Sequence, residues 1–487
     1  MIFTVSLSLC SLGVVSWFVY SVRNPKTAEK LLARLRPFLG GEISSSNPDK
    51  DSLKEKCGAS ELSKAFPPER RSFLDGTSEL VKQREEDLSN SANCVPDKSN
   101  VFEERCSHLL TPTGFSVAEI KALGSFPDYA RLSGVPLPAS YLDFDIRRAQ
   151  PRPYRPFRWA YHQTMSLAKM EPDWWIELEH TYADRIKQRQ NLYAKHGGFV
   201  MQALPGSKIA CKELMEMVLQ FLCARYPQYF QLSPTTSPTT LHNCILSTTT
   251  DLTSTSPLTV LLNNVPEDFA IMLRSPTTGT YSFRAGIICS SLGWNLGTKI
   301  GLDLDAIHAP IPDYKAKMSF SMGRYFSKKP TDKPIQRGSW GLEMDTPLFM
   351  PPGDPHEKLR DEQNPEHKLA DAHLRVDWQT LRRLPLSGAV VFNFKALFTP
   401  VAQLRHEPYV PKLLLKVLTD GKRSIMEYKN TWHTEHIVVP ALRDMVRYQE
   451  EAGLVEKDWE EHTLLESPFF PGWRENWIAE QGFAPPA

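Results

Sequence analysis

The fold class is decided by one stretch of mostly apolar residues, Gly388-Ala389-Val390-Val391-Phe392-Asn393-Phe394-Lys395-Ala396-Leu397-Phe398. Its aromatic and β-branched content is typical of a β-strand. The stretch 281–290 has similar content and predicts a second strand. Elsewhere, helical and extended patterns are interspersed without a regular strand–helix–strand period. We therefore predict an α+β fold with a mainly antiparallel sheet core and surrounding helices.

Apolar residues at helical spacing predict helices over 177–196, 211–225 and 441–452, and a further helix over 257–273. Ser116 is a candidate N-cap for a short helix that begins after it. The segment 233–256 is rich in Ser, Thr and Pro, which favours a surface loop with at most one short strand. The segment 353–367 is a charged loop bounded by prolines.

The N-terminal segment differs from the rest of the chain. Residues 2–20 are uncharged and mostly apolar, and Arg23, Lys26 and Lys30 follow them. About 19 helical residues span the hydrocarbon core of a bilayer, and the positive charge after them places the following chain in the cytosol. We predict a transmembrane anchor over 2–21, a flexible polar linker over 22–100 and a folded domain over 101–487. The expected location is a membrane such as the endoplasmic reticulum; a cleaved signal peptide is the alternative.

Composition and missing motifs exclude several classes of function. The net charge of the 487 residues is +1, which gives no electrostatic reason to expect nucleic acid as a partner. The sequence has no G-x-G-x-x-G or phosphate-binding loop, no G-x-S-x-G elbow and no H-E-x-x-H helix. Its eight cysteines form no C-x-x-C pair, no C-x-x-C-H haem attachment and no cytochrome P450 cysteine loop.

His308 lies in the segment Ile307-His308-Ala309-Pro310-Ile311-Pro312. Because proline fixes φ and restricts the residue before it, we predict an extended segment after His308, with the imidazole at the edge of a rigid elbow. A neutral imidazole that is held rigidly suits an iron or haem site. A hydrogen-bonded structural histidine is the alternative.

Several spaced segments together carry a resemblance to a known family. They are Arg155-Pro156-Phe157-Arg158, Asp173-Trp174-Trp175-Ile176, Arg225-Tyr226-Pro227, Pro266-Glu267-Asp268, the segment around His308, Arg337 with Trp340, Gln379-Thr380-Leu381-Arg382-Arg383-Leu384-Pro385 and Tyr428-Lys429. In this order they resemble the haem-dependent oxidative N-demethylase alpha-subunit-like family, over about 144–442. The resemblance implies a haem b protein with a PAS-like core, in which 101–487 is the haem-binding catalytic domain. It also implies O₂-dependent oxidation of a small organic molecule, in fungal specialised metabolism, with oxidative N-demethylation as the reaction to expect. Electrons would come from an external reductase, because no flavin or iron–sulfur motif is visible.

The resemblance also assigns roles to individual residues. His308 matches an Ile-His-x-Pro motif and is expected to be the axial ligand of the haem iron. Glu267 and Asp268 match an acidic pair that would manage protons near O₂ or hold a substrate ammonium; capping or salt-bridging of a helix is the alternative. Arg337 and Arg382 are expected to pair with haem propionates, with ordinary surface ion pairing as the alternative.

Tyr182 and Arg189 lie seven positions apart on one face of a predicted helix, where we expect core packing. Other positions depart from the family pattern. A Met-Gly pair reads Met165-Ser166, Arg-x-Asn-Trp reads Arg337-Gly338-Ser339-Trp340, and Glu-Arg-Gln reads Asp377-Trp378-Gln379. These departures weaken the transfer of the substrate. Two further functions stay open: a non-enzymatic haem-binding sensor or carrier, and a membrane-anchored scaffold that has lost haem.

Overall fold

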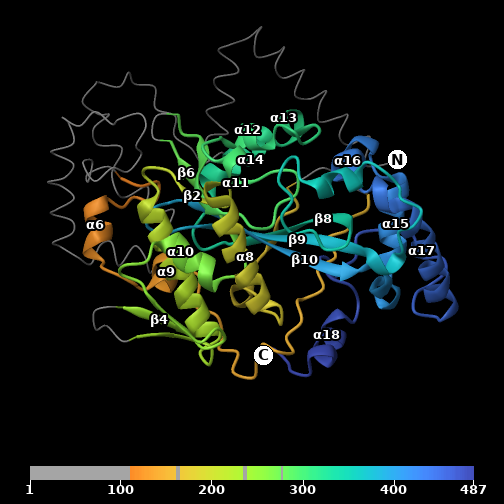
Figure 1. Cartoon of the computed structure of the whole chain (residues 1–487), viewed down its shortest axis with the longest axis horizontal. Helices are drawn as coiled ribbons and strands as arrows, with labels where there is room; N and C mark the ends of the chain where they lie inside the picture. The colour runs from red at the N-terminus through yellow and green to blue at the C-terminus, as the bar shows by residue number, and fades with distance from the viewer. Residues whose placement is uncertain (1–109, 161–164, 234–238, 276–277, 487) are drawn as a thin grey trace, which may run out of the picture. The chain divides into compact units, whose positions relative to one another are not determined.

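The structure is a computed structural model that describes residues 110–160, 165–233, 239–275 and 278–486 (Figure 1). The predicted transmembrane anchor and polar linker lie outside the described residues and stay predictions. No helix in the described ranges is long and apolar enough to cross a membrane.

A seven-stranded sheet forms the centre of the fold, in the order β1-β8-β9-β10-β6-β7-β2. Every neighbouring pair is antiparallel, which confirms the predicted sheet type and the α+β class. The stretch that decided the fold class is β10, which lies between β9 and β6. The strands are Ala168–Lys169 (β1), Met201–Ala203 (β2), Asp268–Arg274 (β6), Tyr281–Ile287 (β7), Ile335–Met344 (β8), Ala372–Arg383 (β9) and Val390–Pro400 (β10). The PAS-like core stays a prediction.

Two of the predicted segments are partly wrong. The helix expected over 257–273 ends at Asn264, and β6 begins at Asp268. Pro266 explains the break, because it disfavours a helical conformation at Val265, which is extended with φ −127° and ψ 126°. The expected loop at 233–256 contains two strands of a small antiparallel sheet, which comprises Phe230–Leu232 (β3), Thr240–Asn243 (β4) and Thr248–Asp251 (β5).

The predicted helices over 211–225 and 441–452 are confirmed, and both are longer than expected. The helix expected from 177 begins later, at Tyr182, and the backbone N–H of Glu177 before it donates to Glu267. Ser116 caps α6 as predicted, in a capping box with Glu119. The α-helices are α6 (Val117–Ala122), α7 (Tyr129–Ser133), α8 (Tyr182–His196), α9 (Lys208–Arg225), α10 (Pro257–Asn264), α11 (Leu296–Lys299), α12 (Leu304–His308), α13 (Tyr314–Lys317), α14 (Ser319–Lys328), α15 (Val410–Asp420), α16 (Arg423–Lys429), α17 (Trp432–Glu451) and α18 (Trp473–Gln481).

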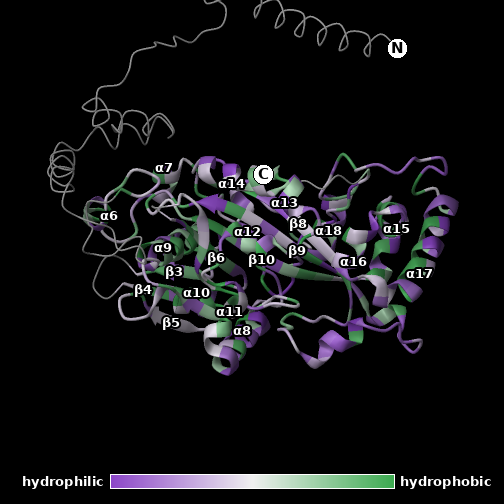
Figure 2. Cartoon of the chain, turned by 90° about the horizontal axis from the view of Figure 1, so that it is seen from above, coloured by the Kyte–Doolittle hydropathy of each residue, from purple (hydrophilic) through white to green (hydrophobic). Residues whose placement is uncertain are grey.

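The two faces of the large sheet carry different helices. On one face, here called face A, Phe269 and Val391 pack with α8, α9 and α10, and Val376 farther along packs with α15 and α17. On the opposite face, here called face B, Leu381 and Phe394 pack with α11 to α14. Figure 1 shows α15 and α17 side by side, well apart from α8, α9 and α10. In Figure 2 the long helix α17 carries both hydrophobic and hydrophilic residues, as expected for a helix that covers a core on one side only.

The turn between β9 and β10 is held from outside the sheet. Glu213 on α9 accepts hydrogen bonds from the backbone N–H groups of Leu386 (2.5 Å) and Ser387 (2.8 Å). Gly388 in this turn has a φ of +68°, in the left-handed region, and a Cβ added there would lie 2.9 Å from Cβ of Pro112. The turn therefore needs glycine for both its backbone conformation and its packing.

We expect Gly388→Ala to lower the free energy of unfolding by roughly 2–4 kcal/mol, from left-handed strain and from overpacking against Pro112. Gly293→Ala is the matched control, because Gly293 has a φ of +73° but nothing within 4 Å of an added Cβ. The control should lose only the roughly 1–2 kcal/mol of strain. Urea denaturation measures both, and equal losses would contradict the packing argument.

Candidate functional site

His308 is the last residue of α12 on face B. Asp303 caps this helix by accepting from the backbone N–H of Ala306. The predicted extended elbow is wrong: Ala309 is helical, with φ −49° and ψ −35°, and the N–H of Ile311 donates to the carbonyl of His308 at 2.9 Å. The prolines therefore follow a helix end, where proline is common, rather than a strand.

One nitrogen of the His308 ring is engaged and the other is not. Nδ1 lies 2.7 Å from the carbonyl oxygen of Leu304, so it carries the proton and donates. Nε2 makes no hydrogen bond to a described residue. Burial lowers the pKa of His308; the bond to Leu304 opposes this, and the positive charges of Arg337 and Lys299 add to it. The ring is therefore neutral at pH 7, with an Nε2 lone pair available to a metal.

Cationic side chains lie near His308. The Nζ atom of Lys299 donates to the carbonyl of Ile307 at 2.7 Å. Arg337 extends from β8 on the same face, opposite Gln379. Lys429 donates to the carbonyl of Trp340 at 2.8 Å, and burial together with Arg337 lowers the pKa of Lys429 to about 8. Arg337 and Lys299 each act on the His308 ring more strongly than the carboxylate of Asp305, so these surroundings favour an anionic group.

Partly exposed apolar residues surround these groups. Ala270 and Phe392 face each other on β6 and β10, in the middle of the sheet, yet both keep partial exposure. The helices on face B therefore leave apolar surface uncovered, as in a site that a ligand covers. The other partly buried apolar residues that pack against this core are Met165, Trp294, Ile300, Ile307, Ile311, Tyr325 and Ile335.

The predicted acidic pair does not lie beside His308. Asp268 faces Phe394 on β10, Phe394 faces Gln379 on β9, and Gln379 faces Arg337 on β8. Three strand spacings, or ~14 Å, therefore separate Asp268 from Arg337. The acidic pair and His308, which the family resemblance groups together, therefore do not form one site in the structure.

Asp268 is fully occupied by structural hydrogen bonds. It pairs with Arg189 on α8 at 2.5 Å and accepts from the N–H of Cys289 (2.9 Å) and of Ser290 (2.7 Å). Neither Asp268 nor Arg189 exceeds 3% exposure of its side chain. Arg189 thus makes an ion pair rather than apolar packing. Tyr182 is fully buried in the core as predicted, and its hydroxyl donates to the carbonyl of Asn264 at 2.8 Å.

Glu267 belongs to a buried polar network on the side of face A. It accepts from the N–H of Glu177 at 3.0 Å and from the side-chain amide of Asn393. Burial raises the pKa of Glu267 to about 8, although Lys395 opposes the shift. Glu267 is therefore protonated at neutral pH, and it does not cap a helix, because a strand follows it.

Arg382 lies on the opposite face from Arg337. It is paired with Val391 across β9 and β10, and its guanidinium carbon is 3.9 Å from the ring centroid of Trp175, within the core of face A. Arg337 is paired with Gln379, which shares the face of Leu381. The structure therefore does not bring the two arginines into one site.

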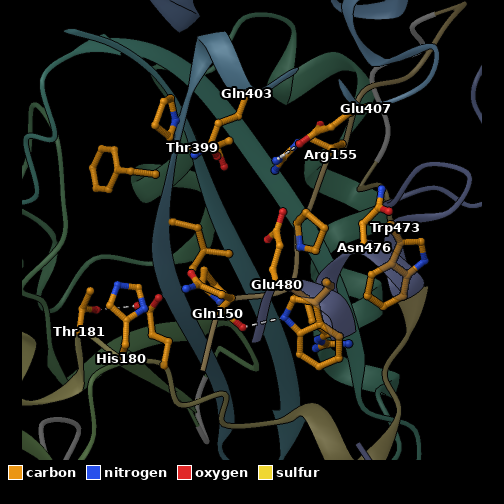
Figure 3. Close-up of a pocket in the computed structure, with 18 of the residues that line it drawn as sticks. Gln150, Arg155, His180, Thr181, Thr399, Gln403, Glu407, Trp473, Asn476 and Glu480 are labelled. Carbon is orange, nitrogen blue, oxygen red and sulfur yellow. Dashed lines mark hydrogen bonds and ion pairs between the residues drawn. The ribbon is translucent and has the colours of Figure 1, made fainter. Parts of the chain in front are cut away.

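A cleft of about 1060 Å³ lies between α8, the end of β10 and α18 (Figure 3). Arg155 and Glu407 form an ion pair in its wall at 2.5 Å, and the indole N–H of Trp477 donates to the carbonyl of Gln150 at 2.8 Å. None of the five predicted site residues lines it. Sequence reasoning missed the cleft because segments near 150, 180, 400 and 475 meet there; the aromatic residues around 469–477 were the signal.

The cleft contains His180, whose Nδ1 lies 3.0 Å from the carbonyl oxygen of Ala149. Its Nε2 is thus also available, but the neighbours in the lining include the carboxylates of Glu179 and Asp184. Across the described part of the chain, no group of three or more His, Cys, Asp or Glu side chains is arranged to hold a metal ion. Haem iron does not need such a group, since one axial histidine can hold it.

The sequence model of the haem-dependent oxidative N-demethylase, alpha subunit-like family matches residues 166–439. The match covers more than half of the 487 residues, and the chain belongs to this family. The resemblance found in the sequence is thereby confirmed. The matched region contains the whole of face B, whereas the segments 150–155 and 470–480 of the cleft lie outside it.

The buried carboxyl of Glu267 makes stability depend on pH. Its folded pKa of about 8 exceeds its ordinary value of 4.5, so the folded state holds a proton that the unfolded state releases between these values. Stability should therefore fall as pH rises from about 5 to 8, by at most ~1.4 kcal/mol per pH unit. In Glu267→Gln this loss should disappear, as measured by urea denaturation at several pH values.

Glu179→Gln is the matched control. Burial alone would raise the pKa of Glu179, but Lys395 and Arg185 lower it below the ordinary value. Glu179 is therefore ionised in both states above pH 5, and its replacement should cost a constant amount across the same range. A wild-type pH slope that persists in Glu267→Gln would show that another group carries it.

Proposed function

We propose that this protein binds haem b on face B, with Nε2 of His308 as the axial ligand of the iron, and acts as a haem-dependent oxidoreductase. The observation that carries the proposal is the hydrogen bond from Nδ1 of His308 to the carbonyl of Leu304. A histidine ligand commonly donates its other N–H to a carbonyl, which fixes the tautomer and the ring orientation.

The residues around His308 fit the chemistry of haem. The porphyrin ring is apolar, and the partly exposed residues Ala270 and Phe392 offer it an apolar surface. Haem also carries two propionates, and we assign Arg337 and Lys299 to neutralise them. Tyr314 stacks on the His308 ring, with centroids 5.2 Å apart, and holds it in place.

Bound haem would supply a redox-active iron for the activation of O₂. The family name supports oxidative N-demethylation as the first reaction to test, on a small methylated amine. Oxidation of the C–H bond beside nitrogen yields a carbinolamine, which collapses to the demethylated amine and formaldehyde. An external reductase would supply the electrons. We give Asp268 a structural role, because its hydrogen-bonding capacity is already used.

Two other interpretations are tested by the same protein. In a haem sensor or carrier the Soret band is present but formaldehyde is not released from methylated amines with reductant and O₂. In a scaffold that has lost haem, no Soret band forms. A third arrangement places haem in the cleft of Figure 3, which is large enough and contains His180. We favour His308, because the positive charges of Arg337 and Lys299 act on its ring. The lining of the cleft around His180 mixes arginines with carboxylates such as Glu179 and Asp184.

His308→Ala should abolish or displace the Soret band of protein expressed with a haem precursor, because it removes the axial nitrogen. His180→Ala is the matched control, since His180 has the same Nδ1-to-carbonyl hydrogen bond and an available Nε2. Absorption spectra with and without dithionite compare the two. The reverse pattern, with loss in His180→Ala alone, would move the haem to the cleft.

Arg337→Gln should weaken haem binding about 10- to 150-fold, because a charge-assisted hydrogen bond contributes roughly 1.5–3 kcal/mol. The Soret maximum should stay in place, since the ligand is unchanged. Titration with haem dimethyl ester, which lacks the propionate charges, provides the control: wild type and variant should then bind equally. An equal loss with haem and with its ester would assign Arg337 a packing role.

A further inference from the structure

Arg382 is a buried cation without a counter-ion among the described residues. Its side chain lies in the core of face A and the residue is only 6% exposed. It makes a cation–π contact with Trp175, but no hydrogen bond or ion pair to a described residue, and its Nε is fully enclosed. Burial lowers its pKa to about 9, so the guanidinium is still charged at neutral pH.

A second donor without a partner belongs to the residue that Arg382 contacts. Trp175 is 1% exposed, and its Nε1 is buried without a hydrogen-bond partner among the described residues. Buried donors in folded proteins nearly always have a partner, which can be an ordered water or an ion. Two such donors on residues in direct contact point to one missing acceptor.

The local charge balance indicates that the acceptor is negative. Burial is the cause that lowers the pKa of Arg382, and no carboxylate among the described residues opposes this shift. Arg383 points the other way and donates to the carbonyls of Lys329 and Gly388. A water molecule would satisfy the hydrogen bonds of Arg382 and Trp175 but not the excess positive charge.

We propose that Arg382 and Trp175 form a binding site for a small inorganic anion such as chloride. The anion accepts from the guanidinium and from the indole N–H and neutralises Arg382. The anion must be small, because Arg382 and Trp175 lie within a packed core and are almost completely buried. A haem propionate at His308 is not the occupant, because Arg382 and Arg337 extend from opposite faces of the sheet. The proposal does not depend on haem binding.

The test measures thermal unfolding of the full chain at constant ionic strength while chloride replaces gluconate. Wild type should show a saturable rise in Tm, because the anion binds the folded state. The rise should be absent in Arg382→Met. In Trp175→Phe the chloride midpoint should increase about 10- to 150-fold, because one hydrogen bond to a charged acceptor is lost.

Arg225→Met is the matched control, since Arg225 is also buried and its guanidinium carbon lies 4.9 Å from the ring centroid of Trp174, but it has Asp173 as its counter-ion. Its chloride response should equal that of wild type. A bromide-soaked crystal adds an anomalous peak in contact with Arg382 as a readout that needs no variant. An unchanged chloride response in Arg382→Met or in Trp175→Phe, or the absence of any halide response in wild type, would overturn the proposal.

Discussion

The buried ion pair between Arg189 and Asp268 is the interaction on which the placement of the helices depends. Arg189 comes from α8, which covers face A, and Asp268 begins β6 in the middle of the sheet. The same carboxylate accepts from the N–H groups of Cys289 and Ser290, where the chain leaves β7 toward α11 and α12. One side chain thus fixes a helix of face A and the path toward His308 on face B. Loss of one partner from such a pair typically costs 3–5 kcal/mol, because the other charge stays buried.

This constraint separates the chemistry of the molecule into two regions. Face A carries the buried polar groups, including Glu267, Asn393 and Arg382, between two apolar clusters. Face B carries His308 and Arg337 beside uncovered apolar surface. The family resemblance groups Glu267, Asp268 and His308 together, but these residues have different roles. The two acidic residues make hydrogen bonds within the core, whereas His308 is available to a ligand.

Local signals in the sequence predicted helices and strands well where no second signal favoured another conformation. The aromatic and β-branched content of β10 and the cap at Ser116 each determine one conformation. The sequence did not reveal on which face of the sheet Arg337 and Arg382 lie, because side-chain direction alternates and depends on strand register. It also did not reveal the helix that ends at His308, since the cap at Asp303 outweighed the prolines that follow. The cleft could not be predicted from the sequence for a different reason, because segments that are far apart in the sequence form it.

The departures from the family pattern can be interpreted through this division. Trp378 lies on face A, where it stacks on Tyr154 with centroids 5.2 Å apart, so the replacement of an arginine there changes core packing and not the surroundings of His308. Ser166 has a φ of +51°, which glycine adopts without strain, so the glycine of the family pattern serves the backbone. Arg337, by contrast, keeps both its identity and its place beside His308. Two of the departures therefore fall on the core and on a backbone position that suits glycine. Ser339, in contrast, lies two residues beyond Arg337 on β8 and shares face B with it, so this change lies on the side of the proposed haem site.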